Sequence, residues 1–385
     1  MNRLLKVLKR TAIVLIILGV LLEAFTLVVR YPNPIASVRL GFAPASKTPT
    51  LQPAHTIAPS TNPITLPTGN EKAPTTVTWQ GKQVSWQEFL DKSYTNAFLI
   101  VRNGVITYQY YKDGFTPTTR LPSYSVGKTM TSIMAGQLIH DGKLKESDTF
   151  VKYFPEYKTG GSFDKVTIQQ LLDMQSGVGV SDNYPTGPSG WGVAIAQMYA
   201  TTDVNWFLKH NRKMAFEPGS QMVYRSVDTQ MLGMVIKKIT GMRIADYFSK
   251  NVWQPIGALT PATWNVDRIG GTEKTFCCFN AAAPDYAKVG LMILNNGMVG
   301  DKHIIDANWV KRLATPVGTM DDWGYGAFMW HPYPGTSTMD GLHGQYVFID
   351  PKTRTVIVKL SDVPTGVKLA IPTMAVLKEI SDKQN

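Results

Sequence analysis

Residues 97–111, AFLIVRNGVITYQYY, place two apolar runs on either side of Asn103-Gly104. Because an Asn-Gly pair is favoured in type I′ turns, this pattern predicts an antiparallel β-hairpin. A second hairpin is predicted near the other end of the chain, where the two runs of QYVFIDPKTRTVIVKL (345–360) flank a turn that contains Pro351. Both ends of the globular part are therefore expected to contribute strands to one antiparallel sheet.

Helical patterns fill the sequence between the two hairpins, and one more follows them. They cover residues 125–141, 167–174, 228–240, 284–295 and 369–381. Strands at both ends with helices between them predict an α+β fold, in which helices flank an antiparallel sheet and an all-α part is inserted in the middle. A cleft is expected where the two parts meet, because ligand sites are common at such junctions.

The composition excludes several classes of protein. With 44% apolar residues in a chain of 385, a large core is available, and a wholly disordered chain is excluded. Two cysteines are too few for a disulfide-rich scaffold or a thiolate zinc site. The net charge is +11, but no Lys/Arg block lies beyond the first 40 residues, so we expect no nucleic-acid partner.

The chain starts with an apolar run that is long enough to cross a bilayer. Residues 11–29, TAIVLIILGVLLEAFTLVV, are interrupted only by Glu23, and a bilayer core needs about twenty apolar residues. Four basic residues precede the run: Arg3, Lys6, Lys9 and Arg10. They predict a cytoplasmic N-terminus, so that residues 1–43 anchor a body on the extracytoplasmic, periplasmic side. The alternative is a cleaved signal peptide and a secreted body, although the run is long for a signal sequence.

The segment after the anchor has the composition of a linker. Residues 44–76 are rich in Pro, Thr and Ser and hold few large apolar residues, which predicts a semi-extended tether. The globular body then covers residues 77–385. Within it Cys277 and Cys278 are adjacent, and both a strained disulfide and two free thiols are open.

The tetrad SVGK at 125–128 is the first candidate for chemistry. An apolar-periodic stretch follows it, so Ser125 is expected at a helix N-terminus, with Lys128 one turn further on the same face. A serine hydroxyl needs a base within reach, and a lysine in a dry cleft has a lowered pKa and can accept the proton. The helix N-terminus supplies N–H groups where negative charge develops. The same spacing recurs in SFDK at 162–165 without a helical pattern, so the spacing alone is not specific.

Two further stretches complete a candidate catalytic set. Tyr224 lies in the order Tyr224-Arg225-Ser226 just before a predicted helix, and a tyrosine beside a cationic lysine can relay protons. The Gly-rich stretch GLHGQ at 341–345 leads into a predicted strand, whose N–H groups can stabilise an oxyanion. Taken alone, each stretch has a simpler interpretation, namely a core tyrosine and a glycine-rich loop.

Other catalytic machinery has little support in the sequence. The chain lacks the motifs G-x-S-x-G, H-E-x-x-H, G-x-x-x-x-G-K-[ST] and C-x-x-C. Its six histidines are scattered without the spacing of metal ligands, so we expect no metal and no cofactor. A Ser-His-Asp triad stays open at this stage.

The order of these elements resembles that of the serine β-lactamase-like family, which includes class C β-lactamases, DD-peptidases, related esterases and 6-aminohexanoate-dimer hydrolases. The matching blocks are SVGK (125–128), VTIQQLLDMQSGV (166–178), FEPGSQMVYRS (216–226), DYAKVGLMILNNGMV (285–299) and GLHGQYVFIDP (341–351). Several blocks in a fixed order are more specific than any one motif. The resemblance implies acyl-enzyme chemistry on a fold that combines an α/β part with an all-α part.

The resemblance also implies a role for each candidate residue. Ser125 resembles the nucleophile, Lys128 its base and Tyr224 the proton relay to the leaving group. The oxyanion would be held by the backbone N–H groups of Ser125 and Gln345. The remaining candidates would contact the substrate or line the strand entry: Asp182, Tyr184, Ser226, His343 and Gly344.

Two departures from the family pattern bear on the substrate. The family's Tyr-x-Asn is Tyr-Arg-Ser here, and its strand Lys-Thr-Gly is replaced by a stretch centred on Leu342-His343-Gly344. The replaced lysine helps to bind a substrate carboxylate, which argues against efficient β-lactam hydrolysis. We therefore expect a membrane-tethered serine hydrolase of small-molecule amides or esters. The alternatives are a DD-peptidase or β-lactamase, and a non-catalytic relative that binds a ligand.

Overall fold

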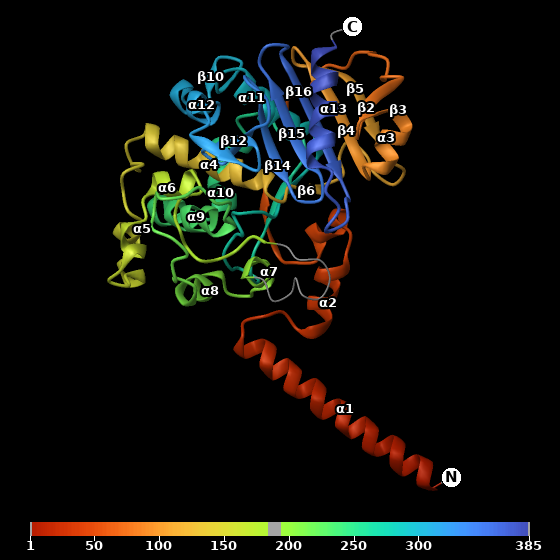
Figure 1. Cartoon of the computed structure of the whole chain (residues 1–385), viewed down its shortest axis with the longest axis vertical. Helices are drawn as coiled ribbons and strands as arrows, with labels where there is room; N and C mark the ends of the chain where they lie inside the picture. Colours follow the sequence, from red (N-terminus) through yellow and green to blue (C-terminus); the bar gives the residue numbers. More distant parts are fainter. Residues whose placement is uncertain (1, 184–193, 384–385) are drawn as a thin grey trace.

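The computed structural model describes residues 2–183 and 194–383, and Figure 1 shows the whole chain. Its largest sheet has eight antiparallel strands in the order β11-β12-β13-β14-β15-β16-β4-β5. These strands are β4 (Thr95–Arg102), β5 (Val105–Tyr111), β11 (Gly318–Met320), β12 (Trp323–Gly326), β13 (Met329–His331), β14 (Ser337–Gly341), β15 (Gln345–Asp350) and β16 (Thr355–Ser361). The two predicted hairpins are β4–β5 and β15–β16, and they join where β16 pairs with β4. The predicted sheet, built from both ends of the body, is therefore confirmed.

The turn of the first hairpin, β4–β5, is formed by Asn103 and Gly104, as the sequence predicts. Asn103 and Gly104 have φ angles of 50° and 82°, the left-handed backbone that a type I′ turn requires. β4 is buried along almost its whole length, whereas β5 lies at the sheet edge and is mostly half-buried. A strand covered on both faces reads as a continuous apolar run, as β4 does.

Helices cover both faces of the large sheet. One face carries α3 (Trp86–Lys92) and α13 (Ala370–Asp382), and the other carries α4 (Val126–His140) and α11 (Ala283–Leu294). Gly290 lets α11 lie close to the sheet, because an added Cβ would come within 2.7 Å of Cγ1 of Val356 in β16. A two-stranded hairpin, β2 (Thr76–Trp79) and β3 (Lys82–Ser85), packs beside α13 and α3.

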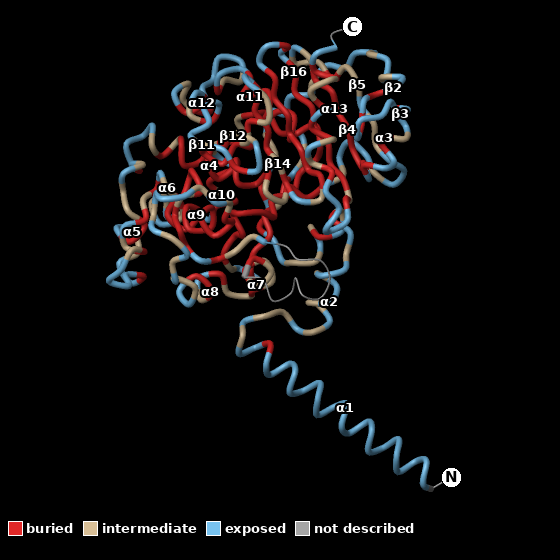
Figure 2. Tube along the Cα trace, in the orientation of Figure 1, coloured by how far each residue is buried: buried red, intermediate tan, exposed pale blue. Residues whose placement is uncertain are grey.

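The inserted part is mainly helical, as predicted. It contains α5 (Phe150–Tyr153), α6 (Ile168–Leu172), α7 (Ala194–Ala200), α8 (Val204–His210), α9 (Ser226–Thr240) and α10 (Ile244–Phe248), with short helical turns at Pro155–Tyr157, Ser162–Lys165 and Ser249–Trp253. Figure 2 shows buried residues both in this part and in the sheet, and one hydrophobic cluster includes residues of both. The one large core therefore holds the two parts together and fixes the elements that meet between them.

The remaining elements border the two parts. A four-stranded sheet joins β1 (Ala54–Ile57), β7 (Ala262–Asn265), β8 (Phe279–Ala281) and β6 (Leu121–Pro122). The others are β9 (Met298–Val299), β10 (Lys302–His303) and α12 (Ala307–Leu313). All five helical patterns found in the sequence correspond to helices of the structure, namely α4, α6, α9, α11 and α13.

The N-terminal run forms α1 (Asn2–Val28), which extends away from the body in Figure 1. Its stretch Arg3–Val28 is long and apolar enough to cross a membrane, and only 6% of its most apolar window is buried. This finding agrees with the predicted anchor by length and composition, which a signal sequence near the N-terminus also satisfies. After α1 come α2 (Pro34–Phe42) and a 3₁₀ helix, η1 (Ala45–Thr50).

The segment predicted to be a tether is partly built into the body. Ala45 and Thr48 of η1 are buried, and β1 pairs in an antiparallel ladder with β7. The amide and hydroxyl of Ser46 donate to the two oxygens of Asp362, at 2.6 and 2.7 Å. The composition of residues 44–76 correctly indicates few apolar side chains. It does not show that backbone groups and short side chains of this segment find partners on the body.

Candidate active site

Ser125 lies at the N-terminus of α4, as the sequence predicts. The turn before it is fixed by Tyr124, whose φ of 44° is in the left-handed region, and by the amide of Ser123, which donates to the carbonyl of Phe279 in β8. The chain continues into α4 from Val126, a helix that is buried along most of its length. Among the described residues, no group accepts a hydrogen bond from the Ser125 N–H. The serine therefore carries a free backbone donor at a helix N-terminus.

Lys128 lies one turn further along α4 and is almost fully buried. Its Nζ is 2.9 Å from Oγ of Ser125, 2.9 Å from Oγ of Ser226 and 2.7 Å from the carbonyl oxygen of Phe276. The structure thus brings together the serine and the lysine of the predicted pair. It adds two oxygens, from the start of α9 and from the loop before β8, that the lysine also contacts.

These contacts define what Lys128 can do in each protonation state. The Phe276 carbonyl can only accept, and the Ser226 hydroxyl donates to Asp182 at 2.6 Å, so its oxygen accepts from the lysine. A neutral amine has two N–H donors and one lone pair, which leaves its lone pair for the Ser125 hydroxyl. An ammonium has three donors for the same three oxygens. A proton can therefore pass from Ser125 to Lys128 without any rearrangement of the neighbours.

Burial sets the protonation of the lysine and of the tyrosine. It lowers the pKa of Lys128 from 10.5 to about 7, against the opposing effect of the Asp182 and Asp228 carboxylates. It raises the pKa of the Tyr224 phenol well above 10, against the opposing effect of a hydrogen bond with Ser125. Near neutral pH much of Lys128 is uncharged and Tyr224 keeps its proton. The lysine is thus suited to accept a proton and the tyrosine to donate one.

Tyr224 is held beside the other two groups by aromatic packing. Nζ of Lys128 lies 5.0 Å from the centroid of its ring. The ring stacks on Trp330 of β13 at 5.6 Å between centroids and meets the edge of Tyr325 of β12 at 6.1 Å. The three side chains that sequence reasoning proposed for catalysis therefore converge on one place.

Asp182 and Ser226, predicted as substrate contacts, make a different set of contacts. Both the amide and the hydroxyl of Ser226 donate to the Asp182 carboxylate, at 2.8 and 2.6 Å. Ser226 is buried, whereas Asp182 also lines the main cavity. Burial raises the pKa of Asp182, and the nearby Lys128 opposes the rise. The pair orients an oxygen toward Lys128. Tyr184, the third residue of that prediction, lies outside the described residues.

The strand entry differs in detail from its prediction. Gln345 is fully buried, and its side-chain amide donates to the carbonyls of His343 and Ser361, so it does not line the cavity that contains Ser125. His343 and Gly344 do line that cavity. Nδ1 of His343 lies 2.7 Å from the carbonyl of Val363 and must carry the hydrogen, and burial lowers the pKa of the ring. His343 is therefore neutral near pH 7 and does not supply the charge of a strand lysine.

The end of strand β14 lies next to Ser125. An ideal Cβ on Gly341, the last residue of β14, would lie 3.2 Å from the Ser125 nitrogen and 2.4 Å from the Ser123 carbonyl oxygen. Only glycine fits so close an approach. The next residue, Leu342, lines both cavities that contain Ser125, and no described residue accepts a bond from its N–H. The backbone donor nearest to Ser125 on this strand is therefore at Gly341–Leu342.

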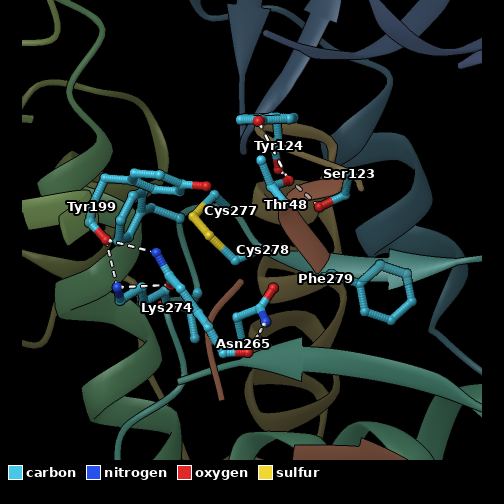
Figure 3. The surroundings of a disulfide bond; sticks show 12 residues. Thr48, Ser123, Tyr124, Tyr199, Asn265, Lys274, Cys277, Cys278 and Phe279 are labelled. Atoms are coloured by element: carbon cyan, nitrogen blue, oxygen red, sulfur yellow. Dashed lines mark hydrogen bonds between the residues drawn. A yellow bond between two sulfur atoms is a disulfide. The ribbon is translucent and has the colours of Figure 1, made fainter. Parts of the chain in front are cut away.

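Sequence reasoning missed the loop before β8, which contacts Lys128 through the carbonyl of Phe276. Phe276 offers its carbonyl to the lysine, and the next two residues, Cys277 and Cys278, form a disulfide. Figure 3 shows this disulfide between Tyr199 and Lys274 on one side and Ser123 and Thr48 on the other. The adjacent cysteines marked the place, but nothing in the sequence indicates which backbone carbonyl reaches a lysine 148 positions away.

The site opens into a cavity of about 970 Å³. Its wall holds Ser125, Asp182 and Tyr224 together with the aromatic side chains Trp323, Trp330 and Tyr346. A smaller cavity of about 130 Å³ lies on the other side of Ser125. In the part of the chain that the structure describes, no group of three His, Cys, Asp or Glu side chains is arranged to hold a metal ion.

The second tetrad with the same spacing lies elsewhere. Ser162 and Lys165 belong to an exposed 3₁₀ turn, where the hydroxyl of Ser162 donates to Glu217. The helical context, rather than the spacing, separates Ser125 from Ser162.

The sequence is similar to those of known proteins. The sequence model of the Beta-lactamase family matches residues 93–373. The 6-aminohexanoate-dimer hydrolase of Paenarthrobacter ureafaciens is 28% identical over 303 residues, which cover 72% of this chain and 75% of that protein. A protein of Escherichia coli (strain K12) named "Putative D-alanyl-D-alanine carboxypeptidase" is 22% identical over 290 residues, 61% of this chain and 66% of its own.

The fold is also that of solved structures. The chain is similar to "Putative 6-aminohexanoate-dimer hydrolase from Bacillus anthracis", with a TM-score of 0.79, 23% identity and coverage of 91% of this chain and 94% of the other. The resemblance noted in the sequence is confirmed by these matches.

Proposed function

Because the chain belongs to the Beta-lactamase family, we propose that it is a serine hydrolase that cleaves an amide or ester bond through an acyl-enzyme on Ser125. The single observation that carries the proposal is the contact set of Lys128. Its amine lies 2.9 Å from the Ser125 hydroxyl, with its other two hydrogen bonds committed to acceptors. A buried base with its lone pair directed at a serine at a helix N-terminus is what nucleophilic catalysis requires.

In the acylation step, Oγ of Ser125 bonds to the substrate carbonyl carbon while its proton passes to Lys128. The oxyanion receives hydrogen bonds from the free N–H of Ser125 and, we propose, from the N–H of Leu342 in place of Gln345. The bond to the leaving group then breaks, and Tyr224 donates the proton that the leaving amine or alcohol needs. The Lys128 ammonium returns a proton to the tyrosine. Water repeats the sequence in reverse to release the acid.

The charge of the strand next to Ser125 favours some substrates over others. Strand β14 reads STMDG, so the residue before Gly341 is Asp340 and no lysine is present. Burial lowers the pKa of His343, against the opposing effect of its hydrogen bond to the Val363 carbonyl, so its ring favours the neutral form near pH 7. Strand β14 offers no cation at the place of the family's strand lysine, and the cations that line the cavity, Arg225 and Lys368, lie on other segments. The absence of a lysine on β14 supports an amide or ester substrate over a β-lactam or a D-Ala-D-Ala peptide. The name of the P. ureafaciens relative supports the same class.

We also propose the arrangement of the chain that the sequence predicts. α1 would remain as a membrane anchor and the body would lie on the extracytoplasmic side, with small-molecule amides or esters as substrates. The span-like length of α1 supports this, as do the basic residues that precede its apolar run.

A labelling experiment on the full chain tests the catalytic assignment. A fluorophosphonate probe should label the wild type and Ser162→Ala equally, and should not label Ser125→Ala. Absence of wild-type labelling, with the body folded by circular dichroism, would favour a binding role. Hydrolysis of a p-nitrophenyl ester, a 6-aminohexanoate dimer, a chromogenic cephalosporin and a D-Ala-D-Ala peptide then ranks the substrates. Preference for either of the last two would overturn the argument from β14.

A further inference from the structure

The exposed surface around α2 is unusually apolar for a segment so close to an active site. Ile35 is 68% exposed, Val38 is 51% exposed and Phe42 is 72% exposed, and α2 has no buried residue. Three more exposed apolar side chains line the larger cavity, Leu342, Val367 and Ile371. We call these six residues the apolar rim. Patches of this kind on a soluble face mark sites of contact with a partner or a membrane.

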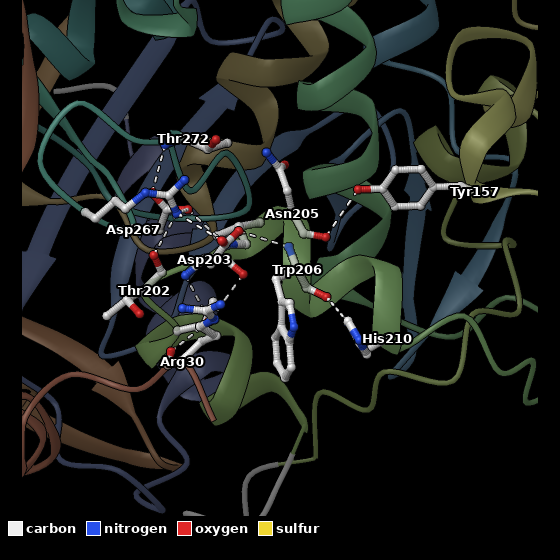
Figure 4. A network of polar contacts seen from close by, with 12 residues as sticks. Arg30, Tyr157, Thr202, Asp203, Asn205, Trp206, His210, Asp267 and Thr272 are labelled. Atoms are coloured by element: carbon white, nitrogen blue, oxygen red, sulfur yellow. Dashed lines mark hydrogen bonds and ion pairs between the residues drawn. The ribbon is translucent and has the colours of Figure 1, made fainter. Parts of the chain in front are cut away.

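The segment that carries α2 is attached to the body on both sides of the helix. The carbonyl of Arg30, just after α1, accepts bonds from the amide of Thr202 at 2.7 Å and from the hydroxyl of Thr201 at 3.1 Å. Figure 4 shows Arg30 next to Thr202 and Asp203 at the start of α8. Beyond α2, Ser46 is bound to Asp362. The body is therefore fixed to the end of α1 at two points, and α2 lies between them, as Figure 1 shows.

α2 is also part of the wall of the active site. Its residues Leu40 and Gly41, and Ala43 just after it, line the smaller cavity together with Ser125. Leu342 lines both cavities, so it connects the α2 side of the rim with the mouth of the larger one. The segment that follows the candidate span thus reaches the nucleophile itself. The packing of α2 beside Ser125 therefore fixes how far the active site lies from the end of α1.

The charges of the segment fit a lipid surface. Residues 30–50 contain Arg30, Arg39 and Lys47 and no acidic residue. A short helix with exposed apolar side chains and neighbouring basic residues, located directly after a span, is the pattern of a helix that lies in the headgroup layer. A protein partner would not need the rim to lie at the end of α1. If α1 crosses a membrane, residues that follow it directly must lie close to the surface of that membrane.

We infer that the apolar rim rests in the headgroup layer of the bilayer that α1 crosses, and that the active site takes its substrate from that layer, as an amphiphilic ester or amide with an acyl chain. The inference rests on the proposed function. Val367 and Ile371 would then contact the acyl chain as it leaves the bilayer, and Leu342 would guide the carbonyl toward Ser125. The chemistry at Ser125 is the same for a soluble ester, which makes the two proposals separable.

The test compares two substrates on the full chain in vesicles of phosphatidylcholine and phosphatidylglycerol. One is water-soluble p-nitrophenyl acetate, and the other is a long-chain p-nitrophenyl ester carried in the same vesicles. The wild type should favour the long-chain ester. The variant Ile35→Glu/Val38→Glu should lose about tenfold or more of that preference, because two charged side chains oppose insertion, and should hydrolyse the acetate at the wild-type rate. Ile269→Glu, at a residue that is 92% exposed on another loop, is the matched control and should change neither rate.

Each outcome has one meaning. Unchanged preference in Ile35→Glu/Val38→Glu would overturn the inference, and so would equal rates of the wild type on both esters. Loss of acetate hydrolysis in the wild type would overturn the proposed function instead. If the double variant self-associates less than the wild type in detergent while keeping its preference for the long-chain ester, the rim is an interface between copies of the chain. Folding of each variant is checked by its melting temperature.

Discussion

Lys128 and Lys359 lie in two parts of the molecule and share two features of their surroundings, namely burial and contact with a serine. Burial lowers the pKa of both amines to about 7. Each donates to a serine hydroxyl and to a backbone carbonyl, and for Lys359 these are Ser361 and, at 3.0 Å, Ser93. A search for buried lysines next to serines would find both. The two sites differ in what surrounds the serine.

Ser125 lies at a helix N-terminus and lines two cavities, and its N–H has no acceptor among the residues that the structure describes. Ser361 lies in β16, is 2% exposed, and its amide donates to the side chain of Gln345. A lysine with a lowered pKa is therefore a common product of burial. Access for a substrate, and donors waiting for an oxyanion, make the difference between a packed pair and a catalytic one.

The largest effect is expected from substituting the two lysines in parallel. Lys128→Met should lower kcat/KM by about 10³-fold or more, because Ser125 loses its base. Lys359→Met should leave kcat/KM within roughly threefold, because no substrate reaches Ser361. Both are measured with a p-nitrophenyl ester on protein shown to be folded by its melting curve. Similar losses in two folded variants would contradict this comparison, because they would show that the surroundings of the serine do not separate a catalytic lysine from a packed one.

The next effect depends on the leaving group. Tyr224→Phe should lower kcat for an alkyl amide by about 10²–10⁴-fold, because the departing amine needs a proton. A p-nitrophenyl ester, whose leaving group departs as an anion, should lose far less. Tyr325→Phe is the matched control, since its hydroxyl is buried without a hydrogen-bond partner in the described residues. Equal losses for the amide and the ester would contradict the role of Tyr224 as the proton donor.

The sequence predicts features that depend on neighbours in the chain. The two hairpins follow from their turns and apolar runs, and the one-turn spacing of Ser125 and Lys128 follows from the helix. The contacts that complete the site join segments far apart: Asp182 to Ser226 across 44 positions and Lys128 to Phe276 across 148. These contacts depend on how loops cross in space, for which no local pattern exists.

The differences between prediction and structure have the same origin. The sequence predicts the backbone N–H of Gln345 as an oxyanion donor because Gln345 follows the Gly-rich turn, whereas the pairing of Gly341 with Gln345 leaves Gly341–Leu342 beside Ser125, which is why we propose the N–H of Leu342 instead. Residues 44–76 have a tether's composition, and the strand that begins at Ala54 exists only because β7 offers it a partner. The register of β14 on β15 explains the first difference, and the edge of β7 that pairs with β1 explains the second.

A smaller effect is expected in the pH profile. kcat/KM should rise with pH through about 7, because Lys128 acts as a base only when it has lost its proton. The negative charge of Asp182 raises the pKa of Lys128, so Asp182→Asn should move this rise to lower pH. We expect a loss of roughly tenfold on the plateau from the weaker orientation of Ser226. Asp164→Asn, at the surface, should leave the profile in place, and a rise at higher pH in Asp182→Asn would contradict the assignment of Lys128 as the base.

The smallest effect is expected from removing the disulfide in the loop that contacts Lys128. Cys277→Ser/Cys278→Ser should lower kcat/KM by only a few-fold, because Phe276 keeps its place in the chain but its carbonyl is held less firmly against the lysine. Its cost in stability should be about 1 kcal/mol, since a bond between adjacent residues closes the shortest of loops and restricts the unfolded chain little. Treatment of the wild type with dithiothreitol should reproduce the change in kcat/KM, and the double variant should not respond to it. A shift in the pH profile of the double variant would show that the disulfide acts through Lys128. A large drop in melting temperature with unchanged kcat/KM would instead assign it to stability.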